Sequence, residues 1–202
     1  MKSSSVVVFD LGKVLVDFDY GIAAKKIAAH STRPAAEIKS FIDQTLLLLD
    51  YESRRLTRRE FFERVRAATG FRGTIEEFGG FFADIFTPIP PMIGLHAALR
   101  RRKIPTYAFS NTNDLAIEHI RRNFPFFADF DGCIFSYEVG AMKPQPEIYE
   151  AMENMSGKRG ADLVYIDDRV ENVDAGNTRG WRTILHETPE KTRAILQTFL
   201  PL

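Results

Sequence analysis

Four short segments of the sequence carry polar side chains of types that can take part in chemistry. Their residues are Asp10 in VVVFD, Ser110 and Asn111 in YAFSNTN, Lys143 in GAMKPQP, and Asp167 and Asp168 in YIDDR. Asp10 lies where a carboxylate would face the mouth of a sheet, Ser110 and Asn111 offer hydroxyl and amide donors, and Lys143 is held between a glycine and two prolines. Each segment alone is a weak signal, because aspartates are common at strand ends and Lys-Pro pairs mark many surface turns.

Each of these residues also has a simpler interpretation. Asp167 and Asp168 can be a helix N-cap followed by an acid in the first turn. Lys143 can be a solvated lysine of a turn, and Ser110 with Asn111 can cap a helix. These alternatives are correlated, because one real site would make all of them wrong together.

The side chains can meet only if the apolar runs before them are parallel strands of one sheet. Runs of this kind lie at residues 6–9, 106–109, 163–166 and 183–185, and a fifth candidate lies at 133–135. They are apolar on both faces, as parallel sheets covered by helices require. Chemistry in open α/β sheets gathers at the carboxyl ends of the strands. The pattern predicts an α/β fold with a three-layer, Rossmann-like core around a central parallel sheet.

A long helical stretch without a convincing strand separates the first two of these runs. We expect helices at about 20–29, 34–49, 57–69 and 78–86, the last two after capping-box pairs Thr57/Glu60 and Thr74/Glu77. The proline-rich residues 87–91 read as a linker. The expected domains are an α/β core of residues 1–16 and 92–202 and an inserted all-helical module of residues 17–91. Its aromatic residues are expected to form its own core: Phe41, Phe61, Phe62, Phe78, Phe81 and Phe82.

Composition limits the possible partners. The chain has 202 residues, with 27 basic and 27 acidic side chains, so no net charge favours nucleic acid or an anionic membrane. The only cysteine excludes an internal disulfide and fits a reducing compartment. We therefore expect a cytoplasmic protein, a monomer or homodimer, that binds neither nucleic acid nor membrane.

Together, the four segments resemble the motifs of the haloacid dehalogenase superfamily, in the right order and across essentially the whole chain. The resemblance is to the subclass whose helical cap is inserted just after the first strand. The runs DLGKVLVDFD and KPQPEIY, with YIDDRVENVDAGNTRGW, are similar to those of sugar-phosphate phosphatases in this subclass, including enzymes that act on glucose 1-phosphate.

The resemblance implies roles for individual residues. Asp10 would be the nucleophile that forms an aspartyl-phosphate, which water then hydrolyses. Magnesium would be held by Asp10, the carbonyl of Gly12 and Asp168, with Asp167 binding directly or through water. The phosphoryl oxygens would be held by Ser110, the backbone N–H of Asn111 and the ammonium of Lys143. Lys143 would also keep Asp10 ionised, and the substrate would be a small phosphorylated metabolite.

Gly12 is the most important departure from the family pattern, because most phosphatases of the superfamily have a second aspartate there as acid and base. The metal site and covalent chemistry survive this change, but general acid help is lost, nominally about 10²–10⁴ in rate. The sugar 1-phosphate phosphatases also have glycine at this position. A sugar 1-phosphate has a less basic leaving oxygen and needs less protonation, which makes it a candidate substrate.

Five other residues lie where they can contact substrate or replace the missing acid. Lys13 can add positive charge near the phosphate or point to solvent. Asp17 and Asp19 can serve as an acid, although hinge or capping roles fit them better. Arg54 and Arg55, in the turn YESRRLT, can reach substrate hydroxyls or a second phosphate, although exposed turn arginines are the simpler interpretation.

Three functions remain open from the sequence. The first is a magnesium-dependent phosphomonoesterase that acts on sugar-phosphate-like substrates. The second is a haloacid dehalogenase, which needs no magnesium, although the doubled carboxylate Asp167–Asp168 suits a metal better. The third is a non-catalytic protein that keeps the fold to bind a ligand or partner, which the loss of the acid at Gly12 would allow.

Overall fold

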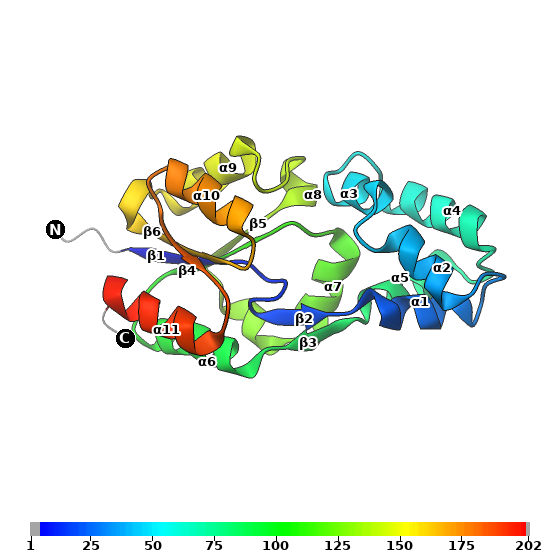
Figure 1. Cartoon of the computed structure of the whole chain (residues 1–202), viewed down its shortest axis with the longest axis horizontal. Helices are drawn as coiled ribbons and strands as arrows, with labels where there is room; N and C mark the ends of the chain where they lie inside the picture. Colours follow the sequence, from blue (N-terminus) through cyan, green and yellow to red (C-terminus); the bar gives the residue numbers. More distant parts are fainter. Residues whose placement is uncertain (1–4, 201–202) are drawn as a thin grey trace.

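A computed structural model describes residues 5–200 and contains a five-stranded parallel sheet (Figure 1). The strand order is β5-β4-β1-β6-β7, so β1 lies at the centre. The strands are β1 (Val6–Phe9), β4 (Thr106–Ser110), β5 (Gly132–Phe135), β6 (Leu163–Asp167) and β7 (Arg182–Leu185). All five predicted strands are therefore confirmed, and the order places Asp10, Ser110 and Asp167 at the same edge of three adjacent strands.

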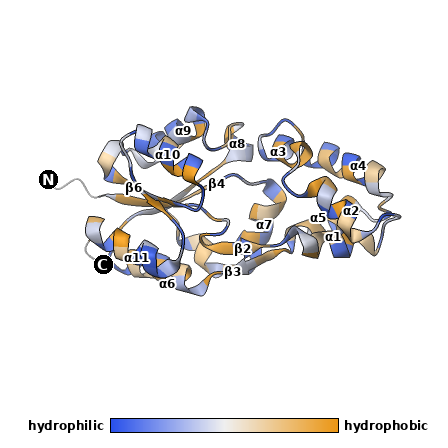
Figure 2. Ribbon diagram, in the orientation of Figure 1, coloured by the Kyte–Doolittle hydropathy of each residue, from blue (hydrophilic) through white to orange (hydrophobic). Residues whose placement is uncertain are grey.

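Helices cover both faces of the sheet and form the three layers that the sequence predicts. One face packs on α6 (Pro90–Arg101), α7 (Asp114–Asn123) and α11 (Pro189–Phe199), and the other packs on α9 (Pro146–Ser156) and α10 (Val170–Thr178). The shorter elements are η1 (Pro125–Asp129), α8 (Ser136–Val139) and η2 (Gly160–Asp162). The helices alternate apolar and polar faces while the central strands are apolar throughout (Figure 2).

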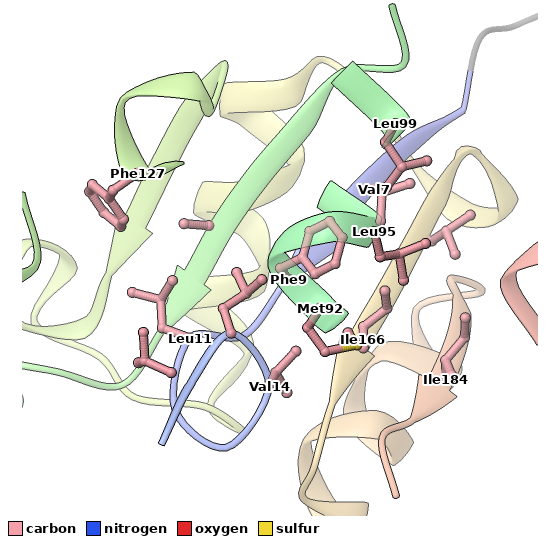
Figure 3. Packing of buried hydrophobic residues seen from close by; sticks show 14 of the residues in the cluster. Val7, Phe9, Leu11, Val14, Met92, Leu95, Leu99, Phe127, Ile166 and Ile184 are labelled. Atoms are coloured by element: carbon pink, nitrogen blue, oxygen red, sulfur yellow. The ribbon is translucent and has the colours of Figure 1, made fainter. Parts of the chain in front are cut away.

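Successive side chains of the central strand β1 pack into the hydrophobic clusters on opposite faces of the sheet. Val7 and Phe9 pack on the side of α6, where they contact Met92 and Leu95 of that helix (Figure 3). Their neighbour Val8 points to the opposite face and joins the cluster under α9. Because successive side chains of a strand alternate between faces, a strand with both faces buried must be apolar throughout. This packing holds Asp10, the next residue, in a fixed position.

The inserted segment forms five helices, which lie beside the carboxyl edge of the sheet (Figure 1). They are α1 (Tyr20–Ala28), α2 (Ala35–Ile42), α3 (Leu46–Glu52), α4 (Arg58–Thr69) and α5 (Ile75–Ala83). Both predicted capping boxes are present, at the starts of α4 and α5. The aromatic residues pack as predicted: Phe61, Phe62, Phe78 and Phe82 are buried in one cluster, with Phe41 and Phe81 partly buried against it.

Three predictions for this segment are wrong. The single helix expected over 34–49 is divided into α2 and α3 at Gln44, whose φ of 54° is left-handed and incompatible with a continuous α-helix. The segment was also expected to lack strands, and residues 87–91 to be a linker. Instead β2 (Val16–Phe18) pairs antiparallel with β3 (Phe86–Pro88), and the prolines that follow begin α6, where a missing N–H costs nothing.

The helical segment also contacts the sheet domain directly through α7. Leu115 of α7 belongs to the aromatic cluster of the segment, and Gly79 of α5 leaves room for it: a Cβ there would lie 2.9 Å from Leu115 Cδ2. Lys26 Nζ lies 2.5 Å from Asp84 Oδ2, and the same aspartate faces His119 of α7. Among residues 5–200, no helix is both long and apolar enough to cross a bilayer.

Candidate active site

The site is centred on Lys143, whose ammonium group lies between two buried carboxylates. Lys143 Nζ lies 3.0 Å from Asp10 Oδ1 and 2.6 Å from Asp167 Oδ2, and it donates a third hydrogen bond of 2.8 Å to the carbonyl oxygen of Phe109. The side chain of Lys143 is only 1% exposed, so the interpretation as a solvated turn lysine is wrong. Burial would lower the pKa of Lys143, but Asp10 and Asp167 raise it, and the lysine stays charged.

Asn111 fixes the loop that carries this lysine. Its Nδ2 donates to the carbonyl of Lys143 at 3.0 Å, and its Oδ1 accepts from the Lys143 N–H at 2.7 Å. The helix cap is instead supplied by Asn113, so the interpretation of Ser110 and Asn111 as caps of α7 is also wrong. Asn111 therefore positions Lys143 through its side chain, while Ser110 ends β4 and lines the cavity beside Asp10.

Asp10 is buried at the end of β1, and one of its oxygens makes contacts with both Leu11 and Lys143. Oδ1 accepts from the Leu11 N–H at 2.7 Å and lies near Lys143. Burial raises the pKa of Asp10 from 3.8 to about 7; Lys143 lowers it, and the carboxylates of Asp167 and Asp168 raise it. A cation beside these three groups would favour the ionised form of Asp10.

Asp167 is saturated with hydrogen bonds from the protein. Its Oδ1 accepts from the Arg169 N–H at 2.9 Å and from Asn172 Nδ2 at 3.0 Å, and its Oδ2 accepts from Lys143 and, at 2.5 Å, from the Tyr165 hydroxyl. Burial would raise the pKa of Asp167, but Lys143 and these donors outweigh it and hold the pKa below its usual value. Asp167 is therefore an ionised anchor for Lys143.

Asp168 completes a cluster of three carboxylates. One oxygen each of Asp10, Asp167 and Asp168 lies within 4.8 Å of the other two. Burial raises the pKa of Asp168, and the charge of Asp167 raises it further. Three carboxylates this close repel one another unless a cation lies between them. All three offer oxygen ligands, which a hard divalent cation such as Mg²⁺ prefers.

A cavity of about 590 Å³ opens from these residues toward the helical segment. Its floor includes Asp10, Gly12, Ser110, Lys143 and Asp168. The helical segment contributes Tyr20 of α1, Gln44 before α3, and Leu48, Leu49 and Glu52 of α3. The cavity is large enough for a small phosphorylated metabolite.

Gly12 is held close to an aromatic ring. A Cβ at Gly12 would lie 3.0 Å from Phe18 Cε1, so the ring of Phe18 occupies the space next to the position where most relatives would carry an acid. Lys13 lies 4.7 Å over the same ring and pairs with Asp17, and it also lines the cavity. A side chain at position 12 would therefore require the Phe18 ring to shift by a few tenths of an ångström.

Four other sequence candidates lie outside the cavity lining. Asp17 pairs with Lys13, and Asp19 caps α1 by accepting from the Gly21 N–H at 2.7 Å. Arg54 donates to the carbonyl of Glu138 at 3.3 Å, and Arg55 lies 3.3 Å from Asp50. The capping role expected for Asp19 is confirmed, a hinge role for Asp17 stays a prediction, and the two arginines do not line the cavity in this structure.

Three residues of the site were not singled out from the sequence. Tyr165 was detectable in principle, because residues two apart on a strand share a face and Asp167 follows it at that spacing. Asn113 directly precedes α7 and has the residue type of an N-cap. Glu52 lies in the turn whose arginines drew attention instead, and the sequence carries no signal that distinguishes it from a surface acid.

The comparison with known families agrees with this geometry. A family model described as haloacid dehalogenase-like hydrolase matches residues 5–178. The chain belongs to the haloacid dehalogenase-like hydrolases. The predictions of this family and of a hydrolase are confirmed, and the α/β fold with its parallel sheet is that of the family's solved members.

Three relatives illustrate the range of the family. A D-ribitol-5-phosphate phosphatase of Bacteroides thetaiotaomicron is 26% identical over 205 residues, which cover 96% of this chain and 97% of the relative. The structure of a family enzyme from the same organism, in complex with magnesium and inorganic phosphate, has a TM-score of 0.80 at 24% identity, covering 91% of this chain and 94% of the other. The L-2-haloacid dehalogenase of Xanthobacter autotrophicus has a TM-score of 0.65 at 17% identity, covering 98% and 84%.

Proposed function

We propose that the protein is a magnesium-dependent phosphomonoesterase that acts on small, sugar-phosphate-like substrates. The observation that carries this proposal is the arrangement of Asp10, Asp167 and Asp168 around Lys143. Three carboxylates within 4.8 Å fit a divalent cation, whereas a dehalogenase works without one. The relative that hydrolyses ribitol 5-phosphate supports the same activity.

The metal would be held by Asp10, the carbonyl oxygen of Gly12 and Asp168. Both oxygens of Asp167 are engaged by protein donors, so this residue would reach the ion through water. When bound, the ion neutralises the substrate phosphate and the nucleophile, so that two anions can approach. Lys143, the Ser110 hydroxyl and the Asn111 N–H would bind the phosphoryl oxygens.

The reaction would proceed in two steps. In the first, Asp10 attacks phosphorus, an O–P bond forms on its carboxylate, and the bond to the leaving oxygen breaks. In the second, water attacks the aspartyl-phosphate and releases inorganic phosphate, restoring the Asp10 carboxylate. With Gly12 in place of the usual acid, substrates whose leaving oxygen needs little protonation, such as sugar 1-phosphates, are favoured.

We further assign the domains and compartment as follows. Residues 1–16 and 92–202 would form the catalytic core, and residues 17–91 a cap that closes over the substrate and excludes water. The cavity between Asp10 and Glu52, lined by both parts, supports this division. The single cysteine, Cys133, is consistent with activity in the cytoplasm.

Turnover of a phosphomonoester panel, with and without Mg²⁺, tests the proposal. We expect magnesium-dependent release of phosphate, with sugar 1-phosphates and aryl phosphates ahead of simple alkyl phosphates. Turnover of 2-haloacids with no phosphate release would favour the dehalogenase. If the protein binds Mg²⁺ but turns over neither phosphomonoesters nor 2-haloacids, the non-catalytic function is favoured. The absence of an acid at Gly12 would then explain the lack of activity.

The metal site predicts a thermal shift that needs no substrate. Saturating Mg²⁺ is expected to raise the Tm of the wild type, since an ion that binds only the folded state stabilises it by about 2.7 kcal/mol at a hundredfold excess over Kd. Replacing Asp168 with Asn should remove most of this shift while leaving the Tm without metal unchanged or higher. Differential scanning calorimetry over a Mg²⁺ titration measures both. An undiminished shift in the variant would contradict the assignment of Asp168 as a ligand.

A further inference from the structure

Two consecutive residues at the end of α3 meet two consecutive residues at the start of α7. The Tyr51 hydroxyl donates to Asp114 Oδ1, and Arg58 Nε donates to Asp114 Oδ2 at 2.8 Å. The next residue on each side, Glu52 and Asn113, lines the cavity above the nucleophile. The contacts to Asp114 therefore hold the Glu52 and Asn113 side chains at one place in the cavity wall.

The orientation of the Asn113 amide is fixed by its role as a helix cap. Its Oδ1 accepts from the Ala116 N–H at 3.0 Å, which leaves Nδ2 as the group free to act as a donor. Asn113 is 1% exposed, and among residues 5–200 its Nδ2 is the buried side-chain polar atom without a hydrogen-bond partner. A buried donor left unpaired costs about 1–3 kcal/mol, so this atom points to a ligand that accepts from it.

Glu52 supplies the complementary group. Its carboxyl lies beside the Asn113 amide and forms no salt bridge with any residue of the range 5–200. Burial raises the pKa of Glu52 to about 7. The Asn113 amide lies close to this carboxyl, without a hydrogen bond of normal geometry to it, and lowers the pKa. With a pKa near neutrality, the Glu52 carboxyl can hydrogen-bond a neutral group without a cation beside it.

The rest of the cap wall provides no positive charge. In the part of the chain that the structure describes, the cap residues that line the cavity are Phe18, Tyr20, Gln44, Leu48, Leu49, Glu52 and Phe86. Besides Lys143, the core contributes two cations to the lining, and each is paired with an acid: Lys13 with Asp17 and Arg169 with Glu171. The cap arginines nearest to it in sequence are engaged elsewhere, Arg54 with Glu138 and Arg55 with Asp50. A second phosphate or a carboxylate on the substrate would meet Glu52 without a cap cation to balance it.

We propose that Asn113 and Glu52 together bind a hydroxyl group of the leaving group and select an uncharged, polyhydroxylated one. This rests on the proposed phosphomonoesterase function. A hydroxyl group is both acceptor and donor, so it accepts from Asn113 Nδ2 and donates to the Glu52 carboxyl at the same time. An alkyl leaving group would leave both protein groups unpaired, and an anionic one would be repelled.

A matched pair of substrates isolates this interaction. Ribitol 5-phosphate and pentyl phosphate have the same chain length and both are esters of a primary alcohol, but only the first has free hydroxyl groups. The ratio of their kcat/KM values is measured in the wild type, in Glu52→Ala, and in Asn113→Asp, which keeps the capping oxygen and replaces the donor. Glu76→Gln, an exposed cap acid, is the control, and Glu52→Gln, which keeps a hydrogen-bonding side chain, is the rescue variant.

We expect Glu52→Ala and Asn113→Asp to lower the ratio about 10- to 100-fold, with pentyl phosphate within about threefold of the wild type. Glu52→Gln should retain most of the ratio, and Glu76→Gln all of it. An unchanged ratio in both variants would overturn the proposed hydroxyl site but not the phosphomonoesterase function. An equal loss on both substrates would also overturn it, because Glu52 would then act in a step that both share. If the wild type released phosphate from neither substrate nor from p-nitrophenyl phosphate, the proposed function would fail and this inference with it.

Discussion

Replacing Asp10 with Asn is expected to lower kcat for every phosphomonoester by at least about 10⁴-fold, because the variant lacks the carboxylate that would attack phosphorus. The geometry of the site should survive, since the Asn oxygen can accept from the Leu11 N–H and from Lys143 as Oδ1 of Asp10 does. Phosphate release under saturating Mg²⁺ and substrate measures the effect. Residual activity within tenfold of the wild type would rule out Asp10 as the nucleophile.

The same variant should be at least as stable as the wild type without metal. Burial raises the pKa of Asp10 to about 7 in the folded state, above the 3.8 of an unperturbed carboxyl. A raised pKa means that the contribution of this group to stability is present below about pH 4 and is lost as the pH rises to about 7. Asn cannot ionise, so urea denaturation at pH 5 and pH 8 should show a smaller decrease in the variant. A larger decrease would contradict this account of the site.

Replacing Lys143 with Met is expected to lower kcat about 10²- to 10³-fold, the range found when one preorganised hydrogen-bond donor at a reacting centre is removed. Lys143 holds Asp10 and Asp167 together through contacts of 3.0 and 2.6 Å, and it would bind the phosphoryl oxygens. Without it, the two buried carboxylates face each other, and the pKa of Asp10 should rise further. The rate profile should then move toward higher pH, because only the ionised form attacks.

The control for this variant is Lys25→Met, at an exposed position of α1 with no role in the site, which should keep wild-type kcat. Circular dichroism and a thermal melt show whether each variant is folded. A folded Lys143→Met protein with kcat within threefold of the wild type would remove Lys143 from the mechanism. If the variant does not fold, Lys143→Gln, which keeps a donor, is measured instead, and the same threshold applies.

The sequence predicts the sheet and its active edge because their signals are local and strong. Strands buried on both faces are unbroken apolar runs, and their polar last residues, Asp10, Ser110 and Asp167, meet because parallel strands end at one edge. The capping boxes at Thr57 and Thr74 are equally local, because a cap involves residues only three positions apart.

What the sequence does not predict depends on contacts between distant residues. The ribbon of β2 and β3 has three-residue strands, one of which ends in proline, and it exists only because two segments far apart in the sequence pair. The division of the second cap helix depends on one left-handed residue, Gln44, of a type that does not favour that conformation. Glu52 comes near Asn113 only once Tyr51 of α3 is bonded to Asp114 of α7. The sequence of the turn does not show this contact, so its arginines were the candidates for binding substrate.

The antiparallel ribbon also makes the cap an exchangeable part. Phe18 and Phe86 are paired across β2 and β3, so the chain leaves the core and returns to it at adjacent points. The loop-closure cost of an insertion between such points rises slowly with its length, by about 0.6 kcal/mol for each doubling. A two-residue hairpin turn is sufficient to connect Phe18 to Phe86 if the intervening residues are removed. Recombination at this junction can therefore supply one phosphate-binding core with different leaving-group sites, without disturbing the sheet.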